Sequence, residues 1–185
     1  MRIGLFATML MMILIPGMAS AKPVTQKVAN TYYDVCMSHE DSRMDAESQT
    51  NLCSCAAARM MSYLSLEDVV RMSADIKDKT GRAIYDKMLV NVYGPCLKLP
   101  VQKALAEQCV ADKKIQQFML RDTTGMCECM AARTGDYMDS DSDNILGTIV
   151  QQDPKVTDLF PRMMTSSRIR GAAENFIYTC MHDQK

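Results

Sequence analysis

The chain has 185 residues, a formal net charge of −1, eight cysteines and two histidines. This length fits one domain or two small ones, and a near-neutral charge argues against nucleic-acid binding, which usually requires a basic surface. Two histidines leave little material for a metal site built from imidazole ligands.

The first predicted element is an export signal over Met1–Ala21. Arg2 is followed by an apolar run over Ile3–Pro16 and by the small residues Ala19-Ser20-Ala21, which is the order of a secretory signal peptide. The run is shorter than the ~20 residues of a membrane-spanning helix. We therefore expect cleavage before Lys22 and a mature chain without a transmembrane anchor, located in the periplasm or secreted.

Two helices are expected at the start of the mature chain. A four-residue repeat of largely apolar side chains marks one face of the first helix, and its members are Val24, Val28, Tyr32 and Cys36. The polar residues of Ser48–Asn51 can cap a second helix, which would then run to Tyr63 or Leu64.

Two further helices are expected before residue 100. Ser65-Leu66-Glu67-Asp68 has the form of a capping box and would open the third helix. The inner face of this helix would carry Val69, Val70, Ser73 and Ile76. Thr80-Gly81 would end it, Arg82–Tyr93 would form the fourth helix, and Gly94-Pro95 would stop the fourth helix just before Cys96.

The second half of the chain is expected to repeat this plan. Residues that mark or cap its four helices are Ala104, Leu105 and Cys109 for the first, Asp122–Thr124 for the second, Asp143-Asn144 for the third and Ser166 or Ser167 for the last. Alternating strand patterns and hairpin turns of the Asn-Gly type are missing from the sequence. The predicted class is all-α, with units of three to four helices.

The cysteines follow one order twice: a single cysteine, a Cys-x-Cys pair and another single cysteine. They are Cys36, Cys53, Cys55 and Cys96, followed by Cys109, Cys127, Cys129 and Cys180. Both pairs begin the heptamer Cys-x-Cys-x-Ala-Ala-Arg, and the first gap covers residues 37–52 in one set and 110–126 in the other. We interpret the pattern as a tandem duplication of a disulfide-stapled helical unit, with domains at 22–99 and 100–185.

The spacing within Cys-x-Cys restricts the possible pairings. Residues i and i+2 of an α-helix point about 200° apart, whereas a disulfide needs Cβ atoms ~3.8 Å apart. Each cysteine of a pair is therefore expected to form a structural disulfide with a single cysteine of its own unit. Two alternatives remain in the first unit, Cys36–Cys53 with Cys55–Cys96 or Cys36–Cys55 with Cys53–Cys96, and the second unit has the same choice.

Other chemistries have weaker support in the sequence. Cysteine and methionine together select Cu(I), but the methionines are not clustered, and His39 and His182 are expected at exposed helix ends. The run Asp139–Asp143 resembles the start of a calcium loop, but Asn144 and Val150 stand where an EF-hand needs Gly and Glu. We expect no metal and no cofactor.

No catalytic motif was found, including the nucleophile elbow, the zinc-protease helix and the phosphate loop. We therefore expect an exported binding protein that is not an enzyme and whose partner is another protein of the envelope or an effector. One alternative is a helical carrier of a small apolar ligand or lipid. A further alternative is a thiol–disulfide oxidoreductase or Cu(I)-binding protein that uses the Cys-x-Cys pairs.

Overall fold

The computed structural model describes residues 21–74, 79–118 and 122–183. Within these ranges the chain is mostly helical and contains no β-strand, although an isolated β-bridge joins Pro23 and Ser65. The all-α class predicted from the sequence is therefore confirmed. No helix in these ranges is both long enough and apolar enough to cross a membrane. The predicted signal lies outside the described residues, apart from Ala21.

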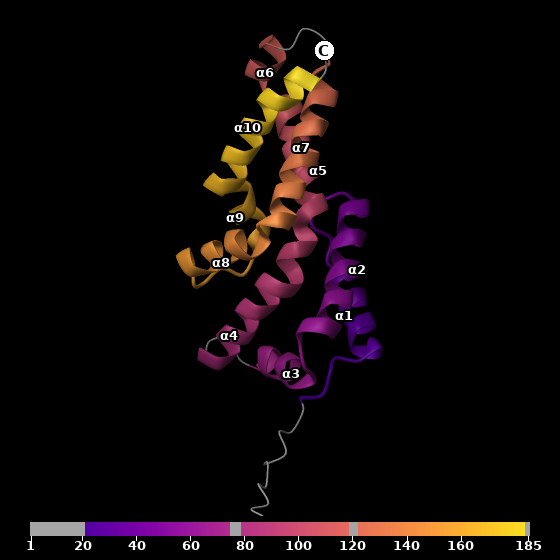
Figure 1. Ribbon diagram of the computed structural model, residues 1–185. Helices are drawn as coiled ribbons and strands as arrows, with labels where there is room; N and C mark the ends of the chain where they lie inside the picture. Colours follow the sequence, from indigo (N-terminus) through magenta and orange to yellow (C-terminus); the bar gives the residue numbers. More distant parts are fainter. Residues whose placement is uncertain (1–20, 75–78, 119–121, 184–185) are drawn as a thin grey trace, which may run out of the picture.

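Twelve helical segments follow one another along the described residues. They are α1 (Gln26–Ser38), α2 (Ala46–Tyr63), α3 (Leu66–Ala74), α4 (Lys79–Met88), the π-helix η1 (Leu89–Tyr93), the 3₁₀-helix η2 (Gly94–Leu97), α5 (Lys98–Ala111), α6 (Lys113–Phe118), α7 (Thr123–Ser140), α8 (Ser142–Gln152), α9 (Leu159–Thr165) and α10 (Ser167–Asp183). Figure 1 shows an elongated molecule in which α5, α7 and α10 run side by side and α1 and α2 form one flank.

A continuous helical path joins the two halves of the chain. α4, η1, η2 and α5 follow one another without a non-helical residue, and Gly94 has right-handed helical dihedrals of φ −57° and ψ −46°. The predicted stop at Gly94-Pro95 is therefore wrong. Pro95 lies at the start of η2 and Pro100 in the first turn of α5, close to the points where the chain changes from π- to 3₁₀-helix and from 3₁₀- to α-helix.

Buried side chains from both halves form one hydrophobic core. Met60 and Val92 of the first half belong to the same cluster as Met126 and Leu159 of the second half. The predicted boundary between residues 99 and 100 falls inside α5, so the helix that crosses this boundary contributes to the shared core.

Three of the predicted helix starts are confirmed, including that of the last helix, because α10 begins at Ser167 directly after Ser166. The amide of Ser65 donates to Asp68 and the amide of Asp68 donates to Ser65 Oγ, both at 3.0 Å, so the capping box is formed. Asp122 caps α7 by accepting a hydrogen bond from the amide of Gly125.

Several other local expectations are wrong. α2 begins at Ala46, because Asp45 accepts from the amide of Ser48 and caps the helix three residues earlier than expected. α4 begins at Lys79, so Thr80-Gly81 opens that helix, and α8 begins at Ser142, before the expected cap. Val70 is 68% exposed, and Ile76 and the side chain of Ser73 lie outside the described residues.

Four cysteine pairs lie at disulfide distance, with Cα–Cα separations of 5.6 to 5.9 Å. They are Cys36–Cys53, Cys55–Cys96, Cys109–Cys127 and Cys129–Cys180. In both halves this is the first of the two alternatives that the sequence left open. Each Cys-x-Cys therefore bonds an earlier helix (α1 or α5) through its first cysteine and a later helical segment through its second.

A close approach between the two halves occurs at Gly94. A Cβ atom placed on Gly94 would lie 2.5 Å from Cδ1 of Leu146 and 2.9 Å from the carbonyl oxygen of Leu89. Leu146 is only 1% exposed, so it has little room to move. Glycine at this position allows the start of η2 and α8 to touch.

We predict that Gly94→Ala destabilises the protein by about 1–3 kcal/mol, because the added methyl group overpacks this contact. Gly147→Ala in α8 is the matched control, since nothing lies within 4 Å of its added Cβ, and it should stabilise the helix by about 0.5–1 kcal/mol. Urea unfolding with the disulfides intact measures both changes. Equal effects of the two substitutions would contradict the packing described here.

Candidate functional site

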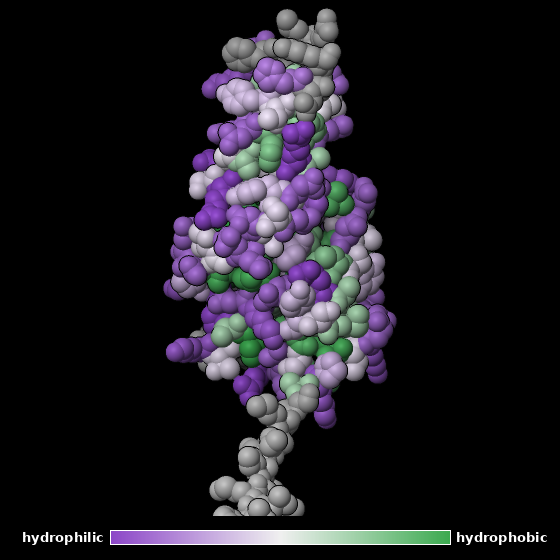
Figure 2. All heavy atoms as spheres, in the orientation of Figure 1, coloured by the Kyte–Doolittle hydropathy of each residue, from purple (hydrophilic) through white to green (hydrophobic). Residues whose placement is uncertain are grey.

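A groove opens beside the turn between α1 and α2. Its volume is about 240 Å³, and its walls come from α1, the turn, α2 and the end of η1. The residues that line it include Tyr32, Val35, His39, Met44, Leu52 and Tyr93. The space-filling view shows hydrophobic residues exposed on this flank of the molecule (Figure 2, right).

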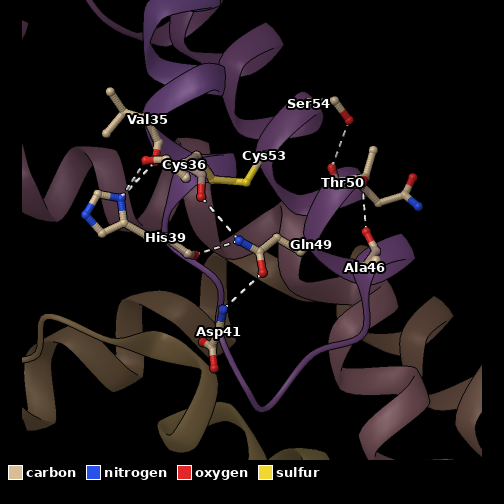
Figure 3. Close-up of a disulfide and its surroundings, with 11 residues drawn as sticks. Val35, Cys36, His39, Asp41, Ala46, Gln49, Thr50, Cys53 and Ser54 are labelled. Atoms are coloured by element: carbon tan, nitrogen blue, oxygen red, sulfur yellow. Dashed lines mark hydrogen bonds between the residues drawn. A yellow bond between two sulfur atoms is a disulfide. The ribbon is translucent and has the colours of Figure 1, made fainter.

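Gln49 fixes the turn that forms one wall of the groove (Figure 3). Its side-chain amide donates to the carbonyl oxygens of Cys36 at 3.2 Å and His39 at 2.6 Å. Its Oε1 accepts from the amide of Asp41 at 3.0 Å. Gln49 is only 7% exposed, so one buried side chain satisfies polar groups at the C-terminal end of α1 and in the turn.

The disulfide Cys36–Cys53 lies next to the three hydrogen bonds of Gln49, which together we call the Gln49 clamp, and forms part of the groove wall. Gln49 lies one helical turn before Cys53 on α2, so the covalent bond and the hydrogen bonds hold the same end of α1. The backbone around the groove is therefore braced in two independent ways.

Arg43 ties the turn to the second half of the chain. It forms ion pairs with Asp41 and, at 2.7 Å, with Asp158, and its guanidinium lies 5.3 Å from the ring centroid of Phe160. The hydrogen bond from Arg43 is the largest influence on Asp41 and holds the pKa of that carboxyl below its usual range. Both carboxylates beside Arg43 are therefore partnered.

Tyr32 and Tyr93 face the groove from two different helical segments. Neither hydroxyl has a hydrogen-bond partner among the described residues, although Tyr85 and Tyr137 do use theirs. Burial, followed by the proximity of Tyr85, raises the pKa of Tyr32 to about 12. Burial and then the charge of Asp158 also raise the pKa of Tyr93. Both phenols are therefore neutral at physiological pH and free to donate a hydrogen bond.

The second half of the chain has apolar residues where these tyrosines stand. Tyr32 lies four residues before Cys36 and Tyr93 three before Cys96, and the residues at the same offsets from Cys109 and Cys180 are Leu105 and Ile177. Leu105 is 7% exposed. The pair of hydroxyls is therefore a property of the first half.

The other residues considered from the sequence lie apart from this groove or have partners. All eight cysteines are in disulfides, so the described residues contain no free thiol. The Nδ1 of His39 lies 2.9 Å from the carbonyl oxygen of Val35, and His182 lies in the last turn of α10. Among the described residues, no group of three or more His, Cys, Asp or Glu is placed to hold a metal ion.

The acidic run of residues 139–143 forms the junction between α7 and α8. Asp141 is the residue between the two helices, and its carboxylate accepts hydrogen bonds from Asn144, Tyr137 and Arg168 at 2.6 to 3.2 Å. This carboxylate is engaged in holding α7, α8 and α10 together.

A small cavity between the start of η2, α7 and α8 is too small for a lipid. It is lined by Gly94, Met138 and Leu146, among others, and has a volume of about 10 Å³. That is about the space for one water molecule, whereas ligand pockets usually measure about 300–1,000 Å³. This cavity cannot take up an acyl chain.

Sequence reasoning missed the groove. The sequence places Tyr32 on the largely apolar stripe of the first helix and Gln49 among the residues that can cap the second. A buried glutamine four residues before a disulfide cysteine is a usable signal only once the helix boundary is known. Tyr93 could not be placed from the sequence, because its direction depends on the π-helical turn that precedes Gly94.

The chain was compared with protein-family models, curated proteins and solved structures, and none of the three comparisons found a match.

We predict that Gln49→Met destabilises the protein by about 2–3 kcal/mol, because a side chain of similar length leaves buried polar groups of the turn without partners. Gln152→Met is the matched control, since Gln152 is exposed at the end of α8 and its side chain forms no hydrogen bond with the described residues. It should change the stability by less than about 0.5 kcal/mol. Chemical denaturation measures the unfolding free energy of both variants. If Gln49→Met lost no more stability than Gln152→Met, the proposed role of the Gln49 clamp would be wrong.

Stability should also depend on Tyr32 in alkaline solution. The pKa of Tyr32 is about 12 in the folded chain and 10.0 without burial, so the unfolded state ionises first. Its contribution to stability is therefore complete below pH 10 and is lost as the pH rises from 10 to 12. Wild type should lose more unfolding free energy over this range than Tyr32→Phe, whereas Tyr178→Phe, at a 65% exposed position, should behave as wild type. Identical pH profiles for wild type and Tyr32→Phe would contradict this.

Proposed function

We propose that this chain is an exported, disulfide-stabilised helical binding protein that engages another protein in the periplasm or outside the cell. The observation that carries the proposal is the groove beside the α1–α2 turn, where two tyrosine hydroxyls have no partner within the described chain. Uncharged donors beside exposed apolar surface suit recognition of another molecule. The rigid frame around the groove reduces the entropy lost on binding.

Export is supported by the leader pattern of Met1–Ala21 and by the cysteine pairs, because disulfides persist in oxidising compartments. The first residues after the expected cleavage site are already part of the folded body. The carbonyl oxygen of Lys22 accepts a hydrogen bond from the amide of Leu66 at 2.8 Å, and Val24 is 4% exposed. Cleavage before Lys22 would therefore remove the leader without cutting into the core.

We further propose that the chain arose by tandem duplication. α2 and α7 each have 18 residues and carry the heptamer that contains Cys-x-Cys. The arginine that ends each heptamer reaches toward the segment bonded to the second cysteine. Arg59 donates to the carbonyl oxygen of Asn91 at 2.8 Å, and Arg133 lies 3.5 Å from the hydroxyl of Thr179. The two arginines stand at the same offset from their Cys-x-Cys, although their partners differ, and this match supports a common origin.

The test uses the full chain with its own leader in a host that exports it. We predict that the mature protein begins at Lys22 and that a photo-crosslinking amino acid at Val35, which is 53% exposed on the groove wall, captures a protein in the exported fraction. The same amino acid at Tyr178 on α10 is the matched control and should capture none. N-terminal sequencing and mass spectrometry provide the readout.

Retention of the leader together with eight free thiols in the cytoplasm would contradict the export proposal. An apolar molecule that co-purifies in native mass spectrometry, with no crosslink from Val35, would favour a carrier instead.

A further inference from the structure

We propose that the groove beside the α1–α2 turn binds a segment of a partner protein that inserts one apolar side chain next to a lysine or arginine. This inference rests on the function proposed above and specifies the chemistry of the partner. The groove is formed by Tyr32, Val35, Met44, Leu52 and Tyr93 together with the disulfide Cys36–Cys53.

The size and lining of the groove fit a single side chain. Its volume of about 240 Å³ is below the range of about 300–1,000 Å³ that is usual for pockets of drug-sized ligands. Val35 and Leu52 supply branched aliphatic surface, and Met44 adds a flexible thioether that can adapt to different apolar shapes. An aliphatic or aromatic side chain can therefore be buried here, while the rest of its segment stays at the rim.

The two phenols can bind the backbone of such a segment. Neutral hydroxyls donate to carbonyl oxygens, and an inserted side chain brings two peptide carbonyls close to the walls of the groove. Because Tyr32 and Tyr93 have no competing partner among the described residues, each can form a hydrogen bond without first breaking another. Recognition of the backbone would then come from the tyrosines, and recognition of the side chain from the apolar walls.

The charge around the turn favours a basic segment. Five carboxylates lie on or beside the turn, and only two cations pair with them. The carboxylates are Glu40, Asp41, Asp45, Glu47 and Asp158, and the cations are Arg43 and Lys103. Arg43 bridges Asp41 and Asp158, and Lys103 bridges Asp45 and Glu47.

Glu40 is exposed and has no partner among the described residues. It lines a second hollow of about 420 Å³ that shares Asp41, Met44 and Gln49 with the groove. A lysine or arginine beside the inserted side chain can pair with this carboxylate, and the surplus negative charge would also steer a basic partner toward the turn.

Tyr93 owes its place in the groove to an irregular stretch of backbone. It ends the five-residue π-helix η1, a type of turn that is rare and often marks functional sites. The amide of Gly94 closes this turn on the carbonyl oxygen of Leu89. A regular α-helix at this point would rotate Tyr93 away from its present direction, so the π-turn is part of the groove.

The test selects peptides from a random displayed library on the oxidised full chain. Enriched peptides should combine an apolar residue with an adjacent lysine or arginine. Affinities of synthetic copies are then measured by calorimetry at low and at high salt. Tyr93→Phe should weaken binding about 5-fold and the double variant Tyr32→Phe/Tyr93→Phe about 10- to 30-fold, because each loses one hydrogen bond. Glu40→Lys should weaken binding about 3- to 10-fold and reduce its salt dependence.

Tyr178→Phe on α10 is the matched control and should bind as wild type. The phenylalanine variants keep the ring, and their far-ultraviolet circular dichroism should match wild type. Enriched peptides that are acidic or lack an apolar residue, or affinities that the groove variants leave unchanged, would overturn the inference. Failure to enrich any peptide would also overturn it. The proposed function is tested by a different experiment, and it would be wrong if crosslinking from Val35 captured no exported protein.

Discussion

The structure depends on the fact that two cysteines separated by one residue leave opposite flanks of a helix. Cys53 and Cys127 are fully buried and bond to an earlier helix, α1 and α5 respectively, whereas Cys55 and Cys129 bond to a segment that follows much later. α2 and α7 are thereby each fixed between two neighbours. In the first half this arrangement also places the groove, because Tyr32 lies one helical turn before Cys36 and Tyr93 lies three residues before Cys96.

The same bracing surrounds different surfaces in the two halves. At the offsets of the two tyrosines the second half carries Leu105 and Ile177, and α6 with its lysines lies between α5 and α7 where the first half has a short acidic turn. The covalent frame is therefore common to both halves, whereas the pair of tyrosine hydroxyls at the groove has no counterpart at the same offsets in the second half. Because the halves share a core, the second half also supports the groove through Asp158 and Phe160.

Features that depend on local sequence could be predicted, and those set by tertiary contacts could not. The all-α class followed from hydrophobic periodicity, the capping box from Ser65 and Asp68, and the exclusion of a bond between Cys53 and Cys55 from helix geometry. The choice between the two remaining pairings needed the positions of α1 and η2. Gly94-Pro95 has the composition of a helix stop, but packing against Leu146 keeps the chain helical there. The free hydroxyls of Tyr32 and Tyr93 become visible only when both helical segments are in place.

Disulfide mapping of the oxidised protein by mass spectrometry, with fragmentation between Cys53 and Cys55 and between Cys127 and Cys129, tests the central claim most directly. The expected disulfides are Cys36–Cys53, Cys55–Cys96, Cys109–Cys127 and Cys129–Cys180, with no thiol free in denaturant. Bonds from Cys36 to Cys55 and from Cys53 to Cys96, or free thiols at either Cys-x-Cys, would contradict it, because α2 could not then hold both tyrosines at the groove.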